Sequence, residues 1–272
     1  MAAKGIYMAV SGALAQSQRL DTIANNIANA NTVGFKRDQQ TFREYLTQLE
    51  KSEDMIRVPR IPASVESFYH LHGEDQSYVD TAGTYTDFSQ GVLLPTGNKL
   101  DLAIDGDGFF EIATPNGIRL TRKGNFKIDG NGMLVTSEGY PVLSADEGAV
   151  EDRVIRLDPS RGDVVDIHED GGVYQGGSFV AQIAVVKVND QRNLRKMGNS
   201  YFDFINDEQN SLALVEQPTL RSGFLEGSNV NVVKEMTDMI QASRAFETNQ
   251  KAIQAYDMIA DKLVNQVGKV SA

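Results

Sequence analysis

The feature that most constrains the fold is the last segment of the chain, which has neither glycine nor proline from residue 228 to residue 267. Ser228 or Asn229 would serve as its N-cap. A helix of about 40 residues would be about 60 Å long, which is longer than an ordinary globular helix and typical of a coiled coil. Its apolar positions recur at helical spacing and are Val232, Met236, Met239, Ile240, Phe246, Ile253, Tyr256, Ile259, Leu263 and Val267.

The first residues of the chain carry a second helical pattern with alternating spacings of four and three, which is a heptad repeat. Gly34 is expected to end this helix in a positive-φ conformation that turns the chain away. We expect the two terminal helices to pair as a coiled coil with each other and with copies in neighbouring subunits; the alternative is two core helices of a compact domain. The positions of the N-terminal repeat are Ile6, Val10, Ala13, Ser17, Leu20, Ala24 and Ile27.

Four asparagines interrupt the end of this N-terminal pattern. Asparagine is a poor interior helix residue, because its side chain competes for backbone hydrogen bonds. A carboxamide both donates and accepts, so contact with another subunit would satisfy it and fix the register of assembly. We therefore expect the effect of these residues to appear in assembly and not in folding of the monomer. They are Asn25, Asn26, Asn29 and Asn31.

The middle of the chain has a different pattern. From about residue 84, Asn-Gly, Asp-Gly and Gly-Gly pairs recur between short apolar or alternating runs such as LDLAI and FVAQIAVVKV. Such pairs are hairpin signals, so the segment 81–225 is predicted to be mainly antiparallel β-structure. Residues 38–80 are unassigned, apart from a short helical stretch, TFREYLTQLE, at 41–50. The fold class is therefore predicted as α+β, with an antiparallel β domain between two long terminal helices.

Composition and charge exclude several functions. The net charge is −11, and the excess of acidic residues lies in the middle of the chain, which argues against a nucleic-acid partner. No apolar run is long enough to cross a bilayer, and the first residues do not have the design of a cleavable signal peptide. Cysteine is absent, so no disulfide framework can form.

No pattern indicates a catalytic, cofactor or metal site. The loops that start at Asp105 and Asp129 lack the oxygen ligands of a calcium-binding loop at the required positions. Asp105 and Asp107 could form a hydrolytic pair, but aspartate before glycine is usually a turn residue. His70 and His72 form an isolated HxH pair. We expect no enzyme activity, no cofactor and no metal.

Three stretches of the chain, taken together, resemble one family. GIYMAVSGALAQSQRLDTIANNIANANTVGFKR at 5–37, LDLAIDGDGFFEI with LTRKGNFKIDGNGMLVTSEGYPVL at 100–143, and the helix-forming segment at 225–268 are similar to the bacterial flagellar axial family of rod and hook proteins. The opening residues and the length are most similar to the proximal-rod members, and distal-rod members are the alternative. Hook members usually carry a larger middle.

The resemblance implies a structural subunit of the flagellar basal-body rod, the drive shaft that transmits torque to hook and filament. It implies that residues 1–37 and 226–272 form an inner tube, that 38–80 are a linker or extension, and that 81–225 form an outer β domain. It also implies export through the flagellar type III apparatus and assembly in the periplasm. The expected partners are copies of the chain, neighbouring rod proteins and the export apparatus.

The expected assembly interface combines both terminal helices with the residues that flank them. A secreted trimeric adhesin and a wall-cutting hydrolase are the competing functions from other classes. The interface residues are Ile6, Val10, Ala13, Leu20, Ala24, Asn25, Asn26, Ile27, Asn29, Asn31, Gly34, Phe35, Asn229, Val230, Asn231, Met236, Met239, Ile240, Phe246, Ile253, Tyr256 and Leu263.

Overall fold

The computed structural model describes residues 2–47, 76–158, 164–205, 212–215 and 217–267. The chain forms two compact units. The first consists of Met1–Ala24, Gln39–Thr84 and Val233–Ala272, and the second of Asn25–Asp38 and Tyr85–Val232. Each unit is therefore built from segments that lie far apart in the sequence. The order of the elements, with a helix at each end and strands between them, confirms the predicted α+β chain.

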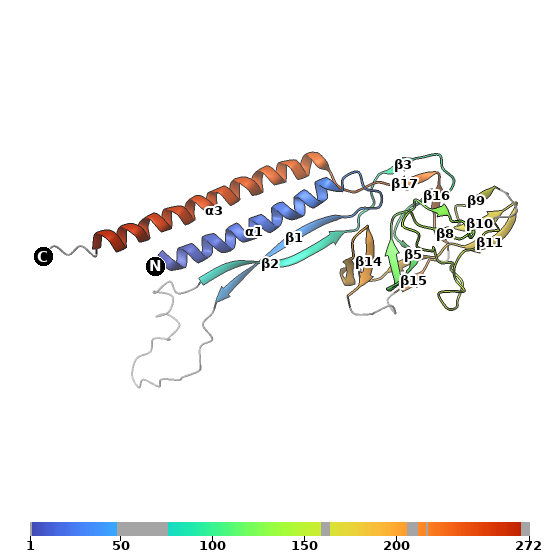
Figure 1. Cartoon of the computed structure of the whole chain (residues 1–272), viewed down its shortest axis with the longest axis horizontal. Helices are drawn as coiled ribbons and strands as arrows, with labels where there is room; N and C mark the ends of the chain where they lie inside the picture. Colours follow the sequence, from blue (N-terminus) through green and yellow to red (C-terminus); the bar gives the residue numbers. More distant parts are fainter. Residues whose placement is uncertain (1, 48–75, 159–163, 206–211, 216, 268–272) are drawn as a thin grey trace, which may run out of the picture. The chain divides into compact units, whose positions relative to one another are not determined.

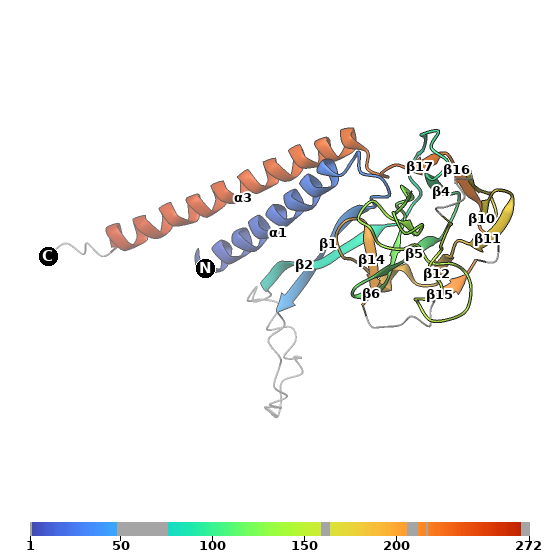
Figure 2. The same ribbon diagram turned by 45° about the vertical axis from the view of Figure 1, so that its right-hand side comes forward.

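Two long helices and a strand pair make up the first unit. Helix α1 spans Ala2–Ala28 and helix α3 spans Val232–Val267. Strand β1, Arg37–Thr47, pairs with strand β2, Gln76–Asp87. Figures 1 and 2 show α3, α1 and this strand pair running side by side. None of the described helices is long and apolar enough to span a bilayer.

The helical stretch predicted at 41–50 is wrong for its first seven residues, which belong to strand β1. The remaining three residues lie outside the described part of the chain. Thr41, Phe42, Tyr45 and Thr47 are β-branched or aromatic and suit a strand. Pairing with β2 satisfies their backbone, and Thr41 Oγ1 also donates to the carbonyl of Gly83 at 3.1 Å. This long-range pairing is absent from any local pattern.

Helices α1 and α3 approach each other at two glycines of α1. A Cβ atom added at Gly12 would lie 3.1 Å from Nδ2 of Asn249, and one added at Gly5 would overlap the ring of Tyr256. Gly5 and Gly12 are seven residues apart, as are Asn249 and Tyr256 in the reverse order, so the two helices run antiparallel with a shared heptad spacing.

The residues of α1 that approach α3 are one position earlier than the predicted seam. Gly5 and Gly12 precede Ile6 and Ala13, and the absence of a side chain allows the Tyr256 ring to come close. Val10 is 36% exposed within the chain. A shift of one residue turns a helix face by about 100°, so the predicted seam does not coincide with the contact between the two helices of one chain.

The second unit is built on a six-stranded antiparallel sheet in the order β13-β14-β6-β5-β12-β15. A three-stranded sheet, β11-β10-β9, and the pairs β16-β4, β17-β3 and β7-β8 complete it. The strands are β3 Leu93–Pro95, β4 Leu102–Ile104, β5 Phe109–Thr114, β6 Gly117–Thr121, β7 Lys127–Ile128, β8 Leu134–Val135, β9 Val165–Ile167, β10 Gly172–Gln175, β11 Ser178–Gln182, β12 Val185–Val188, β13 Leu194–Lys196, β14 Tyr201–Phe204, β15 Leu212–Leu214, β16 Leu220–Ser222 and β17 Phe224–Glu226. A short 3₁₀ helix spans Gln191–Asn193.

Both faces of strand β5 are buried. Phe110 packs in a core with Leu102, Leu134 and Ile183, whereas Phe109 packs with Phe202 in a second core. Successive side chains of a strand point to opposite faces, so one strand supplies both cores. The predicted hairpins are confirmed at the Asn116–Gly117 turn between β5 and β6, at the turn between β7 and β8, and at the turn between β10 and β11.

Candidate functional site

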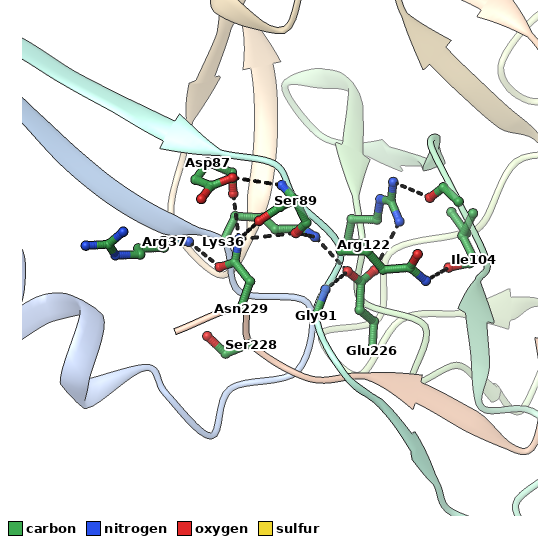
Figure 3. A network of polar contacts seen from close by, with 12 residues as sticks. Lys36, Arg37, Asp87, Ser89, Gly91, Ile104, Arg122, Glu226, Ser228 and Asn229 are labelled. Carbon is green, nitrogen blue, oxygen red and sulfur yellow. Dashed lines mark hydrogen bonds and ion pairs between the residues drawn. The ribbon is translucent and has the colours of Figure 1, made fainter. Parts of the chain in front are cut away.

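Three segments of the second unit cross at one point, which we call the junction: residues 34–38, 86–91 and 226–230. The first follows α1 and opens β1, the second ends β2, and the third joins β17 to α3. Figure 3 shows polar side chains from all three turned toward one another. The junction therefore gathers the connections to both terminal helices and to the β1–β2 strands.

Glu226 lies at the centre of the junction. Lys36 Nζ donates to its Oε1 at 2.6 Å and Arg122 Nη1 donates to its Oε2 at 3.1 Å. The backbone N–H of Gly91 also donates to Oε1, at 2.9 Å. The side chains of Lys36 and Glu226 are 0% exposed and that of Arg122 is 3% exposed, so the whole group is shielded from water.

Burial dominates the electrostatics of Lys36. Desolvation lowers the pKa of its ammonium group, and the Glu226 carboxylate opposes that effect. Lys36 also donates to the carbonyl of Ser89 at 2.7 Å, and Arg122 donates to that of Gly106 at 2.8 Å. Two cations therefore share one carboxylate and two carbonyl oxygens. Loss of the carboxylate charge would strongly destabilise this group, because both cations would then be buried without an anion.

Asn229 ties the three segments together a second time. Its Oδ1 accepts from the N–H of Arg37 at 2.7 Å. Its Nδ2 donates to the carbonyl of Asp87 at 2.8 Å and to the carbonyl and hydroxyl oxygens of Ser89 at 3.1 and 3.0 Å (Figure 3). This residue was predicted for the assembly interface, and the structure places its carboxamide in contacts inside its own chain.

Asn26 is the one buried member of the asparagine group, with 1% of its surface exposed. Its Nδ2 donates to the carbonyl of Asp38 at 2.8 Å, and its Oδ1 accepts from the N–H of the same residue at 3.0 Å. The backbone at the start of β1 therefore satisfies this carboxamide inside the chain, so contact with another subunit is not needed to satisfy it, and the role of Asn26 in assembly stays a prediction. The physical reason is that the chain reverses after α1 and brings β1 back alongside it.

The other asparagines act locally or stand at the surface. Helix α1 ends at Ala28, six residues before Gly34, so Asn29 and Asn31 follow the helix. Asn29 Nδ2 donates to the carbonyl of Asn25 at 2.9 Å, and Thr32 donates to Asn29 Oδ1 at 3.2 Å, which are contacts of a helix end. The side chains of Asn25 and Asn31 are exposed.

Gly34 has φ +66°, which confirms the predicted positive φ, although it does not end the helix itself. Its N–H donates to the carbonyl of Glu226 at 2.8 Å. A Cβ atom here would lie 2.7 Å from the backbone N of Lys123 and 2.8 Å from the carbonyl carbon of Arg122. Glycine is therefore required both by conformation and by the close approach of another segment.

Phe35 and Lys196 close one side of the junction. Phe35 is 4% exposed, and Lys196 Nζ lies 3.9 Å from the centre of its ring. The same ammonium donates to the carbonyl of Lys36 and to Asp38 Oδ2, each at 2.8 Å. Desolvation lowers the pKa of Lys196, and Asp38 opposes the shift. Phe35, another predicted interface residue, is thus covered by β13 of its own chain.

Sequence reasoning missed Lys36, Arg122 and Glu226. A lone charged residue in a polar sequence is usually solvated, and partners this far apart leave no spacing to detect. The available signal was that Lys36 directly follows Gly34 and Phe35 in the sequence. An aromatic residue after a glycine that is predicted to have a positive φ suggests a buried turn. This signal did not identify the carboxylate.

The remaining predicted interface residues differ in exposure, and they lie on the two helices apart from Val230 and Asn231, which directly precede α3. Ala13 is buried; Ile6, Leu20, Ile27, Val230, Met239, Phe246, Ile253 and Tyr256 are partly buried; and Val10, Ala24, Asn231, Met236 and Ile240 are exposed. The side chain of Leu263 lies outside the described residues. The exposed group leaves apolar surface on both helices uncovered within one chain.

The predicted turn aspartates form ion pairs on the surface. Asp105 Oδ2 accepts from Arg221 Nε at 2.8 Å, and Asp107 Oδ2 accepts from Lys187 Nζ at 2.9 Å. The hydrogen bond from Lys187 lowers the pKa of Asp107. His70 and His72 lie outside the described residues, and within those residues no cluster of three or more His, Cys, Asp or Glu side chains could hold a metal.

The chain matches three family models in the order of its segments. They are a flagella basal body rod protein model at residues 6–36, a flagellar hook protein FlgE/F/G D1 domain model at 103–175, and a flagellar basal body rod FlgEFG protein C-terminal model at 221–267. It is 36% identical to the flagellar basal-body rod protein FlgG of Bacillus subtilis, with 96% of this chain and 98% of that protein aligned. This chain belongs to the flagellar basal-body rod family.

Two further relatives of this rod protein carry the name FlgF. It is 31% identical to the flagellar basal-body rod protein FlgF of Rhizobium meliloti, with 97% of this chain and 98% of that protein aligned. It is 33% identical to FlgF of Mesorhizobium japonicum, with 98% of each chain aligned. Relatives of both names thus align over nearly the whole rod protein, so the choice between proximal and distal rod stays a prediction.

The family models and the geometry coincide at the junction. The first model ends at residue 36 and the third begins at residue 221, so Lys36 and Glu226 lie inside the matched segments. Arg122 lies inside the second. All three family segments therefore contribute one residue to the buried ionic group of this rod protein, which is a structural subunit of the flagellar basal body.

Proposed function

We propose that this rod subunit assembles helically through its terminal helices, which pair as an antiparallel coiled coil and pack against copies in the neighbouring subunits. The observation that carries the proposal is a row of exposed apolar side chains on each helix. On α1, Tyr7, Val10 and Leu14 are 63, 36 and 61% exposed. These positions lie on one helix face, where exposed apolar surface marks an interface.

Helix α3 carries a matching row. Val233, Met236 and Ile240 are 75, 51 and 56% exposed and follow the same spacing of three and four. The glycine contacts at Gly5 and Gly12 occupy a different part of α1, so pairing within a chain leaves both rows free. Two free apolar rows on a helix pair suit a subunit that contacts neighbours on more than one side.

The resemblance to axial proteins supports further details of the proposal. Residues 1–37 and 226–272 would line the tube, 38–80 would form an extension, and 81–225 would form the outer domain. The subunit would leave the cytoplasm through the flagellar export apparatus, assemble in the periplasm and transmit torque to the hook. Of the two rod positions, the opening residues and the length support the proximal one.

Electron microscopy of concentrated protein tests the assembly. The unaltered chain is expected to form tubes or helical filaments, and Leu14→Glu with Ile240→Glu is expected to abolish them without changing the melting of the sheets of the second unit, which we call the β unit. Val164→Glu, at a residue 63% exposed in the second unit, is the matched control and should leave filaments intact. Discrete trimers of the unaltered chain would favour the adhesin alternative, and peptidoglycan zymography tests the hydrolase.

A further inference from the structure

Glu226 receives contacts from three distant parts of the chain. Its side chain accepts from Lys36, which lies 190 residues earlier, from Gly91, 135 residues earlier, and from Arg122, 104 residues earlier. Its backbone carbonyl accepts from the N–H of Gly34 at 2.8 Å. One residue near the start of the C-terminal helix thus contacts every other segment of the junction (Figure 3).

The charges of this group make Glu226 indispensable. Lys36 and Arg122 are both enclosed, and Nε of Arg122 is buried without a hydrogen-bond partner among the described residues. Without the carboxylate, two cations would lie buried against carbonyl oxygens alone. A buried charge left unpaired is far less stable than one in water, so the segments would separate and let water reach the cations.

We propose that Glu226 is a latch that closes the junction in a single step and only when the carboxyl-terminal part of the chain has arrived. Before that step, Lys36 and Arg122 stay hydrated, and residues 226–230 are not yet docked against the segments 34–38 and 86–91, which the pairing of β1 with β2 already brings together. After it, the connections to α1, to the β1–β2 strands and to α3 are fixed together. A chain that lacks residue 226 holds its junction open, so only a complete subunit acquires the closed form.

The backbone geometry supports closure as one event. Gly91 passes so close to Gly227 that a Cβ atom at Gly91 would overlap the carbonyl oxygen of Gly227. The N–H of Gly227 donates to the carbonyl of Val92 at 2.8 Å. The segment that carries Glu226 therefore contacts 91–92 along its backbone as well as through the carboxylate, so both sets of contacts belong to the closed form.

Hydrogen exchange of the full-length chain in dilute solution tests the latch. Glu226→Gln keeps the shape of the side chain and removes its charge. We expect exchange at the amides of Arg37, Gly91 and Gly227 to become about tenfold faster or more, and by a common factor, because a buried charge left unpaired opens the whole junction. The amides of Val142 and Leu157, which bond to Leu134 and Gly132 inside the β unit, should keep their protection.

Glu111→Gln is the matched control. Glu111 is 4% exposed and pairs with Arg153, so it also loses a buried carboxylate, but its partners lie within the β unit. It should leave the amides of Arg37 and Gly227 unchanged. If Glu226→Gln fails to fold, the double variant Glu226→Gln with Lys36→Met, which removes one of the two cations left unpaired, should fold and show a smaller common increase at Arg37, Gly91 and Gly227.

Two results would overturn the proposal. Faster exchange at Gly91 alone, with Arg37 and Gly227 unchanged, would reduce Glu226 to a local hydrogen-bond acceptor. An equal loss of protection at Val142 and Leu157 would mean that the substitution unfolds the β unit as a whole and that no separate closing step exists.

Discussion

Lys36 and Glu226 are separated by 190 residues, yet Nζ of the lysine lies 2.6 Å from Oε1 of the glutamate and neither side chain is exposed. The lysine follows the N-terminal helix and the glutamate precedes the C-terminal helix. Because a buried ion pair loses about as much in desolvation as it gains in attraction, its main consequence here is geometrical. The pair fixes the point at which the segment after α1 meets the segment before α3.

Gly34→Ala is expected to destabilise the second unit by about 2 kcal/mol or more, since a positive φ costs about 1–2 kcal/mol for a residue with a Cβ. The overlap with the backbone of Lys123 and Arg122 adds to that cost. Thermal melting of the purified chain measures the effect. Gly97→Ala is the control, because Gly97 has φ +74° but open space around it, so it should show the conformational cost alone.

Asn26→Ala is expected to lower the free energy of unfolding by about 1–3 kcal/mol, because it leaves the backbone groups of Asp38 without their partner. This replaces the expectation from sequence that the effect would appear only in assembly. Chemical denaturation of the monomer measures the change. Asn25→Ala, at an exposed position of the same helix turn, should lie within about 0.5 kcal/mol of the parent. Equal stability of both variants would contradict the role of Asn26.

The antiparallel register of α1 and α3 can be tested by enlarging a side chain on one helix and shortening the side chain that faces it on the other. Gly5→Ala places a methyl group against the ring of Tyr256 and is expected to weaken filament formation. Tyr256→Ala in the same chain should restore filament formation, because it removes the ring that the new methyl group would overlap. Asn249→Ala combined with Gly5→Ala should give no rescue, since Asn249 faces Gly12. Rescue by Asn249→Ala and none by Tyr256→Ala would disprove the register.

Glu138 should contribute a pH-dependent part of stability. Burial by itself would raise the pKa of this carboxyl, but hydrogen bonds from Lys123, Tyr201 and Ser137 outweigh it and lower the pKa to about 2. A folded-state pKa below the unfolded value of 4.5 means that the contribution is complete above pH 4.5 and disappears as the pH falls toward 2. Melting temperatures of the parent and of Glu138→Gln should therefore converge in this range.

The two melting temperatures are expected to converge because protonation removes the carboxylate charge that the partners of Glu138 bind. In the parent, Lys123 Nζ and the Tyr201 hydroxyl each lie 2.6 Å from an oxygen of Glu138. Asp129 is a second carboxylate whose pKa is lowered by hydrogen bonds, here from the N–H groups of Met133 and Asn131 in an exposed turn, so melting temperatures of the parent and of Asp129→Asn should also converge as the pH falls. A constant difference between the parent and Glu138→Gln from pH 7 to pH 2 would show that Glu138 does not titrate in this way.

The sequence by itself determined the elements whose causes are local. The absence of glycine and proline from residue 228 to residue 267 allowed one long helix, and Asn116–Gly117 set a tight hairpin, because both effects act between near neighbours in the chain. The positive φ of Gly34 belongs to the same class, since a glycine after a run of poor helix formers marks a turn. These features follow from backbone sterics and short-range hydrogen bonds.

Only the tertiary structure decided which side chains are buried and with what partners. Strand β1 replaced a predicted helix because β2, far along the chain, supplies its hydrogen bonds. Asn26 turned inward because β1 returns beside α1, and Lys36 could be buried because Glu226 arrives from the other end of the chain. Burial of a polar group depends on a partner in space, and the spacing of residues along one chain does not encode that partner.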